Sequence, residues 1–328
     1  MRNYILRYLA NLGPSLASFV LIELSSLLAR LTKLGWTAEP ANRTIVDDVS
    51  GFLDASEAHC AIGLALLSRL VAEMNTSASL ASAAAARRSL THAQHRKVAS
   101  SFRDALLLRI FKLSLSALAK FAAVPGKLRG GALDVALACL NFDFIGSSFD
   151  DTVEDVGTIQ MPVAWRAVVQ DPDTLALFLD VYASCTAPAG ADGASAGGSG
   201  DAIDPVQSAK CLDALVQLVS VRRTLFASDD ARFAYLRTHM SGMLSILRTR
   251  RGLDNHDNYH HFCRWLTRLK ANYQLAELVA TEGYEEWISL VASFTRNSLA
   301  SDWRWVGDSL FYLLTLWARL VAAMPYLK

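Results

Sequence analysis

The chain has 328 residues and is nearly neutral, because 32 Lys and Arg side chains are balanced by 31 Asp and Glu side chains for a net charge of +1. That balance excludes the strongly basic surface expected of a protein that binds nucleic acid or an anionic membrane. Apolar residues make up 52% and charged residues 19% of the sequence, which excludes a disordered chain. The five Cys are odd in number and widely spaced, so they predict reduced, buried thiols.

Helical periodicity begins near the N-terminus. Between Pro14 and Leu34, apolar residues recur at steps of three and four, which places one broad apolar stripe on a helix. Gly35 follows this segment and is predicted to end the helix in the left-handed backbone conformation. The same spacing runs from Trp303 to Met324 at the other end of the chain and predicts a last helix there.

The intervening sequence continues the helical pattern. Asp171-Pro172 and Asp204-Pro205 place a capping carboxylate and a proline where a helix should begin. One short extended segment is expected near Thr158 to Pro162. The further predicted helices cover about residues 42–53, 57–75, 98–122, 129–140, 172–184, 205–219, 230–249, 258–279 and 284–299.

These helices occur in pairs at a spacing of about 40 residues, the period of HEAT and armadillo repeats. The sequence therefore predicts an all-α HEAT/armadillo-type solenoid that continues over residues 1–328, although a compact helical bundle would give a similar local pattern. Two inserts, at about 76–91 and 186–202, are rich in Ala, Ser and Gly and are interpreted as flexible loops.

The patterns that carry catalytic chemistry are missing. His256, His260 and Cys263 would share one helix face, but zinc needs a fourth ligand or water, and Asp257 would point elsewhere. Neither a GxxxxGK[ST] nor a GxGxxG phosphate loop occurs. The sequence therefore predicts no metal, no cofactor and no enzymatic activity.

Two basic clusters stand out against the even overall charge. Arg222 and Arg223 are predicted to lie within a helix, whereas Arg248, Arg250 and Arg251 are predicted to crowd a helix end. A cation at a helix C-terminus stabilises the helix by about 0.3–1 kcal/mol, so a helix-end role is favoured for the second cluster.

An acidic, non-periodic loop covers about residues 141–162, within a longer stretch that has no Lys or Arg. Long loops inside compact folds tend to be functional or disordered. The candidate binding residues are therefore four acids, interpreted as a docking surface for a basic partner: Asp150, Asp151, Glu154 and Asp155. The alternative is a solvated loop held in place by Phe142, Phe144 and Ile145.

The N-terminal segment predicts neither a membrane span nor a signal peptide. In the N-terminal half of the chain, the longest uncharged run extends from Tyr8 to Ile22 and is interrupted by Gly13-Pro14. A membrane-spanning helix needs about 20 apolar residues. Arg7 interrupts the first apolar run, which argues against a secretory signal. Arg2 and Arg7 without a nearby acid leave a mitochondrial transit peptide as an alternative.

Several longer segments are similar to one family. The sequence resembles the exportin-7 family of nuclear transport receptors, within the importin-β superfamily, in colinear blocks over nearly its whole length. The blocks are RNYILRYLA at 2–10, TKLGW at 32–36, HRKVASSFRD at 95–104, LNFDFIG at 140–146, VSVRRTLF at 219–226, NYHHFCRWLTRLKANYQLAEL at 258–278 and YLLTLWARLVAAMPY at 312–326.

The resemblance implies a HEAT-repeat receptor that shuttles between nucleus and cytoplasm through the nuclear pore. Its implied partners are Ran in the GTP form, cargo proteins and Phe-Gly nucleoporins, with no direct nucleic-acid or membrane contact. The alternative function is a static HEAT-repeat scaffold for a cytosolic protein complex, which would bind its partner without nucleotide dependence.

Family members are much longer, so the chain is expected to be a fragment in which residues 1–12 are a remnant of the N-terminal repeats. The first helix supports this expectation, because it carries an apolar stripe with no capping repeat before it. Both ends are therefore predicted to expose apolar surface. The stripe consists of Tyr4, Ile5, Tyr8, Leu9 and Leu12.

Overall fold

The computed structural model describes residues 1–76, 90–145, 158–187 and 204–327. Over these residues the protein is all-α, as predicted, and a single isolated β-bridge joins Ile159 to Val221 in the predicted extended region. The chain forms two compact units, Met1–Thr152 and Val153–Lys328. The expectation of one continuous array from residue 1 to residue 328 concerns the junction between these units and stays a prediction.

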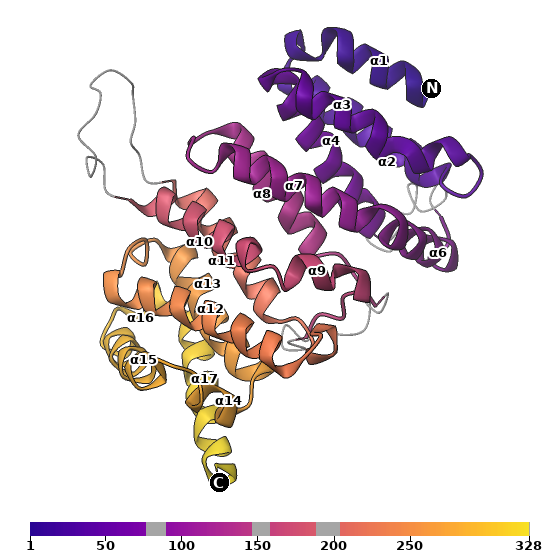
Figure 1. The fold of residues 1–328 in the computed structure, drawn as a ribbon. Helices are drawn as coiled ribbons and strands as arrows, with labels where there is room; N and C mark the ends of the chain where they lie inside the picture. Colours follow the sequence, from indigo (N-terminus) through magenta and orange to yellow (C-terminus); the bar gives the residue numbers. More distant parts are fainter. Residues whose placement is uncertain (77–89, 146–157, 188–203, 328) are drawn as a thin grey trace, which may run out of the picture. The chain divides into compact units, whose positions relative to one another are not determined.

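The first unit consists of antiparallel helix pairs (Figure 1). Its helices are α1 (Arg2–Leu12), α2 (Ser18–Leu34), α3 (Ile45–Ala55), α4 (Glu57–Asn75), α6 (His92–Phe102), α7 (Leu108–Phe121) and α8 (Lys127–Leu140). A π-helical turn at Arg103–Leu107 joins α6 to α7, and short 3₁₀ turns lie at Gly13–Ser15 and Pro40–Thr44.

Helix α4 is the centre of the first unit, because it packs against α2, α3 and α8. Its buried residues therefore cover a broad face rather than a narrow stripe, as Ile62, Leu64 and Leu66 illustrate. The C-terminus of α4 is closed from α2, where Lys33 Nζ donates to the carbonyl oxygens of Glu73 at 2.6 Å and Thr76 at 2.7 Å. Such a cation compensates the partial negative charge of the last helical turn.

The second unit repeats this arrangement in two layers, with α10, α12 and α15 in one and α11, α13 and α17 in the other. Its helices are α9 (Arg166–Val169), α10 (Pro172–Thr186), α11 (Pro205–Val219), α12 (Asp229–Thr249), α13 (His256–Asn272), α14 (Leu275–Val279), α15 (Tyr284–Leu299), α16 (Trp303–Val306) and α17 (Ser309–Ala323). Short 3₁₀ turns lie at Val163–Trp165, Arg223–Leu225 and Met324–Tyr326. Within each layer, helices of successive pairs pack on one another, as α11 does on α13 and α13 on α17, which is the HEAT-type solenoid that the sequence predicts.

The predicted caps are confirmed where proline begins a helix. The Asp171 carboxylate accepts from the backbone N–H of Asp173 at 3.1 Å, and the Asp204 carboxylate accepts from that of Gln207 at 3.0 Å. Each bond satisfies one of the amide groups that the first helical turn leaves without an intrahelical partner.

Gly35 is not left-handed, contrary to the prediction, because its φ is −89° and its ψ is 3°. Its role is to admit a neighbour. A Cβ at this position would lie 2.4 Å from Nδ2 of the buried Asn42. The sequence therefore indicated correctly that a glycine is needed here. It is needed because Asn42 approaches the backbone closely, not because the backbone is left-handed.

Three predicted helices are interrupted. The segment from Pro14 divides into a 3₁₀ turn and α2, and the segment 258–279 breaks at Tyr273, which is extended at φ −120° and ψ 138°. The last helix breaks at Gly307, whose φ is 36°. Arg222 and Arg223 also leave the helical ladder, because Arg222 N–H donates to Ile159 O at 3.1 Å across the β-bridge.

The first and last helices expose apolar residues, as predicted for both ends. Tyr4 and Leu12 of α1 are exposed, whereas Ile5 and Leu9 of the same predicted stripe are buried. Helix α17 buries Leu313, Leu316 and Leu320 and exposes the residues of its opposite face: Phe311, Leu314 and Val321.

One helical stretch in the described part of the chain is long and apolar enough to cross a membrane, judged by length and composition alone. It covers Ser309–Tyr326, with a mean hydropathy of 1.2. A single stretch of this kind is weak support for a span. This one also packs in the fold, because α17 lies against α13 and Trp317 Nε1–H donates to Thr295 Oγ1 at 2.9 Å.

The two layers of the second unit are joined by a buried histidine. Trp265 Nε1–H of α13 donates to His239 Nδ1 of α12 at 3.1 Å, so Nδ1 accepts and the ring is the neutral Nε2–H tautomer. That Nε2–H has no hydrogen-bond partner among the described residues. Complete burial lowers the pKa of His239 from 6.5 to about 3.

The first prediction concerns stability against pH. Because the folded pKa of His239 lies below the unfolded value, the unfolded chain takes up the proton first, and stability falls as the pH drops from about 6.5 toward about 3. We expect His239 to account for a loss of about 1.4 kcal/mol between pH 7.5 and pH 5.5. Urea unfolding at the two pH values measures it.

The variant His239→Asn keeps an acceptor for Trp265 without a titrating ring, so its unfolding free energy should decline less over this interval. His256→Asn, on an exposed histidine at the start of α13, is the control and should keep the wild-type slope. An unchanged pH slope in His239→Asn would show that the proton is taken up elsewhere.

Candidate functional site

The four predicted docking acids, Asp150, Asp151, Glu154 and Asp155, lie outside the residues that the structure describes. The chain that leads to them is fixed. Asn75, at the end of α4, accepts the backbone N–H of Asp143 at 2.8 Å and donates to Asn141 O at 3.2 Å. Phe142 and Phe144 are buried here as predicted, whereas Ile145 is exposed.

The chain that follows them is fixed within the second unit. Ile159 N–H donates to Ser220 O at 2.7 Å, and Arg222 N–H returns a bond to Ile159 O at 3.1 Å. The Arg222 guanidinium also donates to the Gln160 side-chain oxygen at 2.6 Å and 2.7 Å. Arg222, which the sequence placed within a helix, therefore holds the extended segment at Ile159 and Gln160 instead.

The histidines of α13 serve structural contacts. His256 is exposed beside Asp257, while His260 Nδ1 lies 3.0 Å from Ser309 Oγ of α17. Cys263 is completely buried, and that burial raises the pKa of its thiol. Within the described ranges, no group of three or more His, Cys, Asp or Glu side chains is placed to hold a metal ion.

The Arg248 cluster lies at the end of α12, as predicted, but it also connects α12 to α15. The Arg248 guanidinium forms a bidentate pair with the Glu286 carboxylate at 2.5 Å and 2.7 Å, and this bond lowers the pKa of Glu286. Arg250 adopts φ 56° and places its guanidinium 5.0 Å from the centre of the Phe294 ring.

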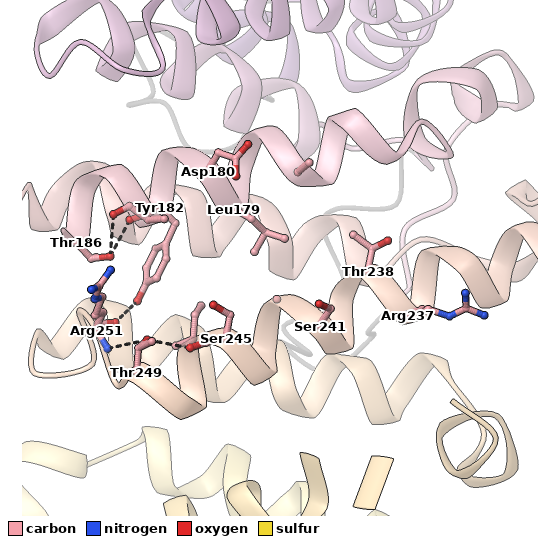
Figure 2. A pocket seen from close by; sticks show the side chains of 14 residues that line it. Leu179, Asp180, Tyr182, Thr186, Arg237, Thr238, Ser241, Ser245, Thr249 and Arg251 are labelled. Carbon is pink, nitrogen blue, oxygen red and sulfur yellow. Dashed lines mark hydrogen bonds between the residues drawn. The ribbon is translucent and has the colours of Figure 1, made fainter. Parts of the chain in front are cut away.

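A groove of about 530 Å³ lies between α10 and α12 (Figure 2). We call it the α10–α12 groove. Its apolar lining comes from Leu179, Tyr182 and Ile246. Hydroxyl groups line the α12 side at Thr238, Ser241, Ser245 and Thr249, and these side chains recur on one face of the helix.

Gly242 sets the floor of the groove. A Cβ at this position would lie 2.8 Å from Leu179 Cδ2 and 3.2 Å from the Trp265 indole ring. The side chain of Leu179 therefore packs directly on the α12 backbone. The two helices approach closely along this line, and the groove opens on either side of the contact.

Charged groups mark the rim of the groove. Arg237 and Arg251 lie toward its two ends on α12 and the following loop, and Asp180 lies on α10 between them (Figure 2). All three are exposed. In the described part of the chain none of them forms an ion pair, so their charges are available to a ligand.

The end of the groove at Arg251 is held by two side chains. Tyr182 O–H of α10 donates to Arg251 O at 2.8 Å, as Figure 2 shows. Asn258 Nδ2 of α13 donates to Gly252 O at 3.0 Å and to Ser208 Oγ of α11 at 2.9 Å. Three helices thus fix one loop, and the loop fixes the length of the groove.

Sequence reasoning missed this groove. The signal that was available is the run of small residues along α12, from Thr238 to Thr249, on one helix face. A search for apolar stripes ignores such a run, because small polar residues contribute nothing to the stripe. Helix α10 is separated from α12 in the sequence by the second insert and by α11, so no local sequence pattern relates the two walls of the groove.

The fold defines a class of protein, a helix-pair repeat protein, and the groove lies on the surface of one of its helix layers. Comparison with known proteins then gives the family. The chain is 40% identical to Ran-binding protein 17 of Homo sapiens and 42% identical to Exportin-7-A of Xenopus laevis, in both cases over all of its length. It is 30% identical to Exportin-7 of Dictyostelium discoideum over 99% of its length.

The chain is therefore an exportin-7-like sequence, homologous from end to end to a part of these proteins. It spans about 28% of the length of the first two relatives. No family model matches the chain.

The second prediction tests the hydrogen bond that holds the groove end. Tyr182→Phe removes the donor to Arg251 O inside a buried contact, so unfolding free energy should fall by about 1 kcal/mol. Chemical denaturation measures this loss. Tyr326→Phe is the control, because Tyr326 is 83% exposed and should tolerate the change. Equal stability of Tyr182→Phe and the wild-type chain would contradict the assignment.

Proposed function

We propose that this chain is a segment of a nuclear transport receptor that binds Ran in its GTP form, cargo proteins and Phe-Gly nucleoporins, and that shuttles between nucleus and cytoplasm through the nuclear pore. The observation that carries the proposal is similarity over the whole chain to proteins named exportins and Ran-binding proteins. Those are names of transport and binding proteins, and the proposed role involves no catalytic step by this chain.

The physical mechanism is linked binding. Ran-GTP and cargo would stabilise the same arrangement of the helix pairs, so that each ligand raises the affinity for the other. A stack in which each helix pair packs mainly on its neighbours supports this proposal, because small rotations between successive pairs add up along the array. Hydrolysis of GTP on Ran would then release the cargo.

The α10–α12 groove fits the nucleoporin part of the proposal. Its apolar lining from Leu179, Tyr182 and Ile246 can bury an aromatic side chain such as Phe. The hydroxyls of Ser241 and Ser245 can hydrogen-bond to the backbone of an extended, glycine-rich peptide. A single shallow site of this kind gives weak binding, which suits a receptor that must move between many repeats.

The third prediction is nucleotide-selective capture of Ran. Immobilised chain should retain Ran locked in the GTP form and retain Ran-GDP much less, at equal concentrations. Quantified elution in both states is the measurement. Equal retention of the two forms would favour the static scaffold over the transport receptor. Absence of retention would mean that this segment alone lacks a Ran site.

The same capture assay tests the four acids, whose docking role stays a prediction. Reversal of Asp150, Asp151, Glu154 and Asp155 to Lys should leave the thermal unfolding unchanged and weaken a basic partner. Unchanged binding of Ran, cargo and nucleoporin repeats to this variant would refute their docking role.

The fourth prediction concerns the groove. Ser245→Trp would place an indole in the α10–α12 groove and should weaken a Phe-Gly repeat peptide at least about threefold. Ser289→Trp, on an exposed face of α15, is the matched control and should bind like the wild-type chain. Fluorescence anisotropy with the Phe-Gly peptide and a Ser-Gly twin gives the affinities. Equal loss in both variants would exclude the groove as the site.

A further inference from the structure

A second cavity, of about 480 Å³, lies where the C-terminal turns of α13 and α17 meet the chain at Thr158. Its charged side chains are those of Lys270 on α13 and Arg319 on α17, and Thr158 adds a hydroxyl. The rest of the lining is mainly small or aromatic and consists of Ala271, Ala322, Ala323 and Tyr326. Two cations therefore face one cavity with an otherwise mainly apolar wall.

Lys270 is only 9% exposed and is poorly satisfied for a buried ammonium group. Its Nζ makes a single hydrogen bond among the described residues, to Tyr273 O at the long distance of 3.5 Å. Burial lowers the pKa of Lys270, and the charge of Arg319 lowers it further. Arg319, which is half-buried, thus places a second positive charge near Lys270 and raises the free energy of the empty site.

The nearest acid does not neutralise this pair. Glu277 acts on Lys270 electrostatically, but its carboxylate pairs with Arg232 and accepts the Gln274 backbone N–H at 2.7 Å. Across the described ranges, neither Lys270 nor Arg319 forms an ion pair. An ammonium group of this kind, buried without an ion-pair partner, is unusual unless a ligand supplies the counter-charge.

We propose that this cavity is an anion-binding site that takes the carboxylate of an acidic side chain from an extended segment of a partner protein. The carboxylate would lie between Lys270 and Arg319 and accept charge-assisted hydrogen bonds from both. The alanine and tyrosine lining would contact the aliphatic part of the same side chain and an apolar neighbour. This lining favours a peptide over a free inorganic anion, which would leave most of the 480 Å³ unfilled.

A purely structural role is the competing explanation. Lys270 lies in the last turn of α13, where a cation compensates the exposed carbonyl groups. A purely structural role predicts that replacing Lys270 lowers the stability of the protein but leaves its affinity for an acidic peptide unchanged. The test therefore measures peptide affinity, which a change in stability alone would not alter. The site is independent of the Ran proposal, because neither Ran nor a Phe-Gly repeat enters the experiment.

The fifth prediction uses a fluorescein-labelled peptide with three repeats of Glu-Leu-Gly-Ser as the probe, and its Gln twin as the uncharged reference. Anisotropy titration should show binding of the Glu peptide at least tenfold tighter than that of the Gln peptide. Lys270→Met and Arg319→Met should each weaken the Glu peptide about tenfold and leave the Gln peptide unaffected. Thermal unfolding of both variants confirms that they are folded.

Arg304→Met is the matched control, because it removes the same charge from an exposed arginine of α16 in the same unit and should bind the probe normally. Equal affinity for the Glu and Gln peptides, or an equal loss in all three variants, would overturn the proposal. Tighter probe binding after neutralisation of Asp150, Asp151, Glu154 and Asp155 would assign the site to the chain's own acids and would also overturn it.

A second measurement reports on the site itself. Reductive methylation with ¹³C keeps the charge of each lysine and lets NMR follow the titration of Lys270. Saturation with the Glu peptide should raise the pKa of Lys270, because an anion beside an ammonium group favours its charged form. An unchanged pKa in the presence of saturating Glu peptide would contradict binding at this cavity.

Discussion

The structure depends on one packing constraint: each helix pair buries its apolar side against the next pair along the chain. Helix α4 shows the consequence in the first unit, because its contacts with α2, α3 and α8 bury a broad face of its middle turns. Helix α13 occupies the same position between α11 and α17. Burial at about 25 cal/mol per Å² of apolar surface makes these central helices the main source of stability, and the outer helices align on them.

Polar groups inside this packing are tolerated where a neighbouring helix supplies a partner. Lys33 Nζ donates to a carbonyl oxygen in the last turn of α4, and His239 accepts the Trp265 indole N–H. Asn258 Nδ2 donates to Gly252 O and Ser208 Oγ. These bonds connect helices that apolar packing alone would leave free to slide. Lys270 is the exception, since it lies near another cation and forms a single long hydrogen bond to Tyr273 O but no ion pair among the described residues. That contrast within one fold is the reason to assign a ligand to its cavity.

Binding surfaces in this fold arise where the packing of neighbouring helices is incomplete. Between α10 and α12 the close contact at Gly242 is flanked by small hydroxyl residues, which leave a groove instead of a filled seam. Between the ends of α13 and α17, alanines and two long cations leave a second cavity. The first is mainly apolar with a charged rim, and the second is cationic. The two sites therefore suit ligands of different chemistry on one repeat scaffold.

The sequence by itself determined the helical class, the pairing of helices and many of their limits, because these follow from local periodicity and caps. Residues 57–75, 205–219 and 284–299 form helices with the predicted bounds, and Asp171 and Asp204 cap as expected. The tertiary structure alone decided the conformation of Gly35, the break at Tyr273 and the β-bridge that draws Arg222 out of a helix. It also decided both cavities, since Lys270 and Arg319, like Leu179 and Gly242, come from different helices. Local sequence fixes what one helix does, but a groove is a property of two helices, and their spacing depends on which side chains meet between them.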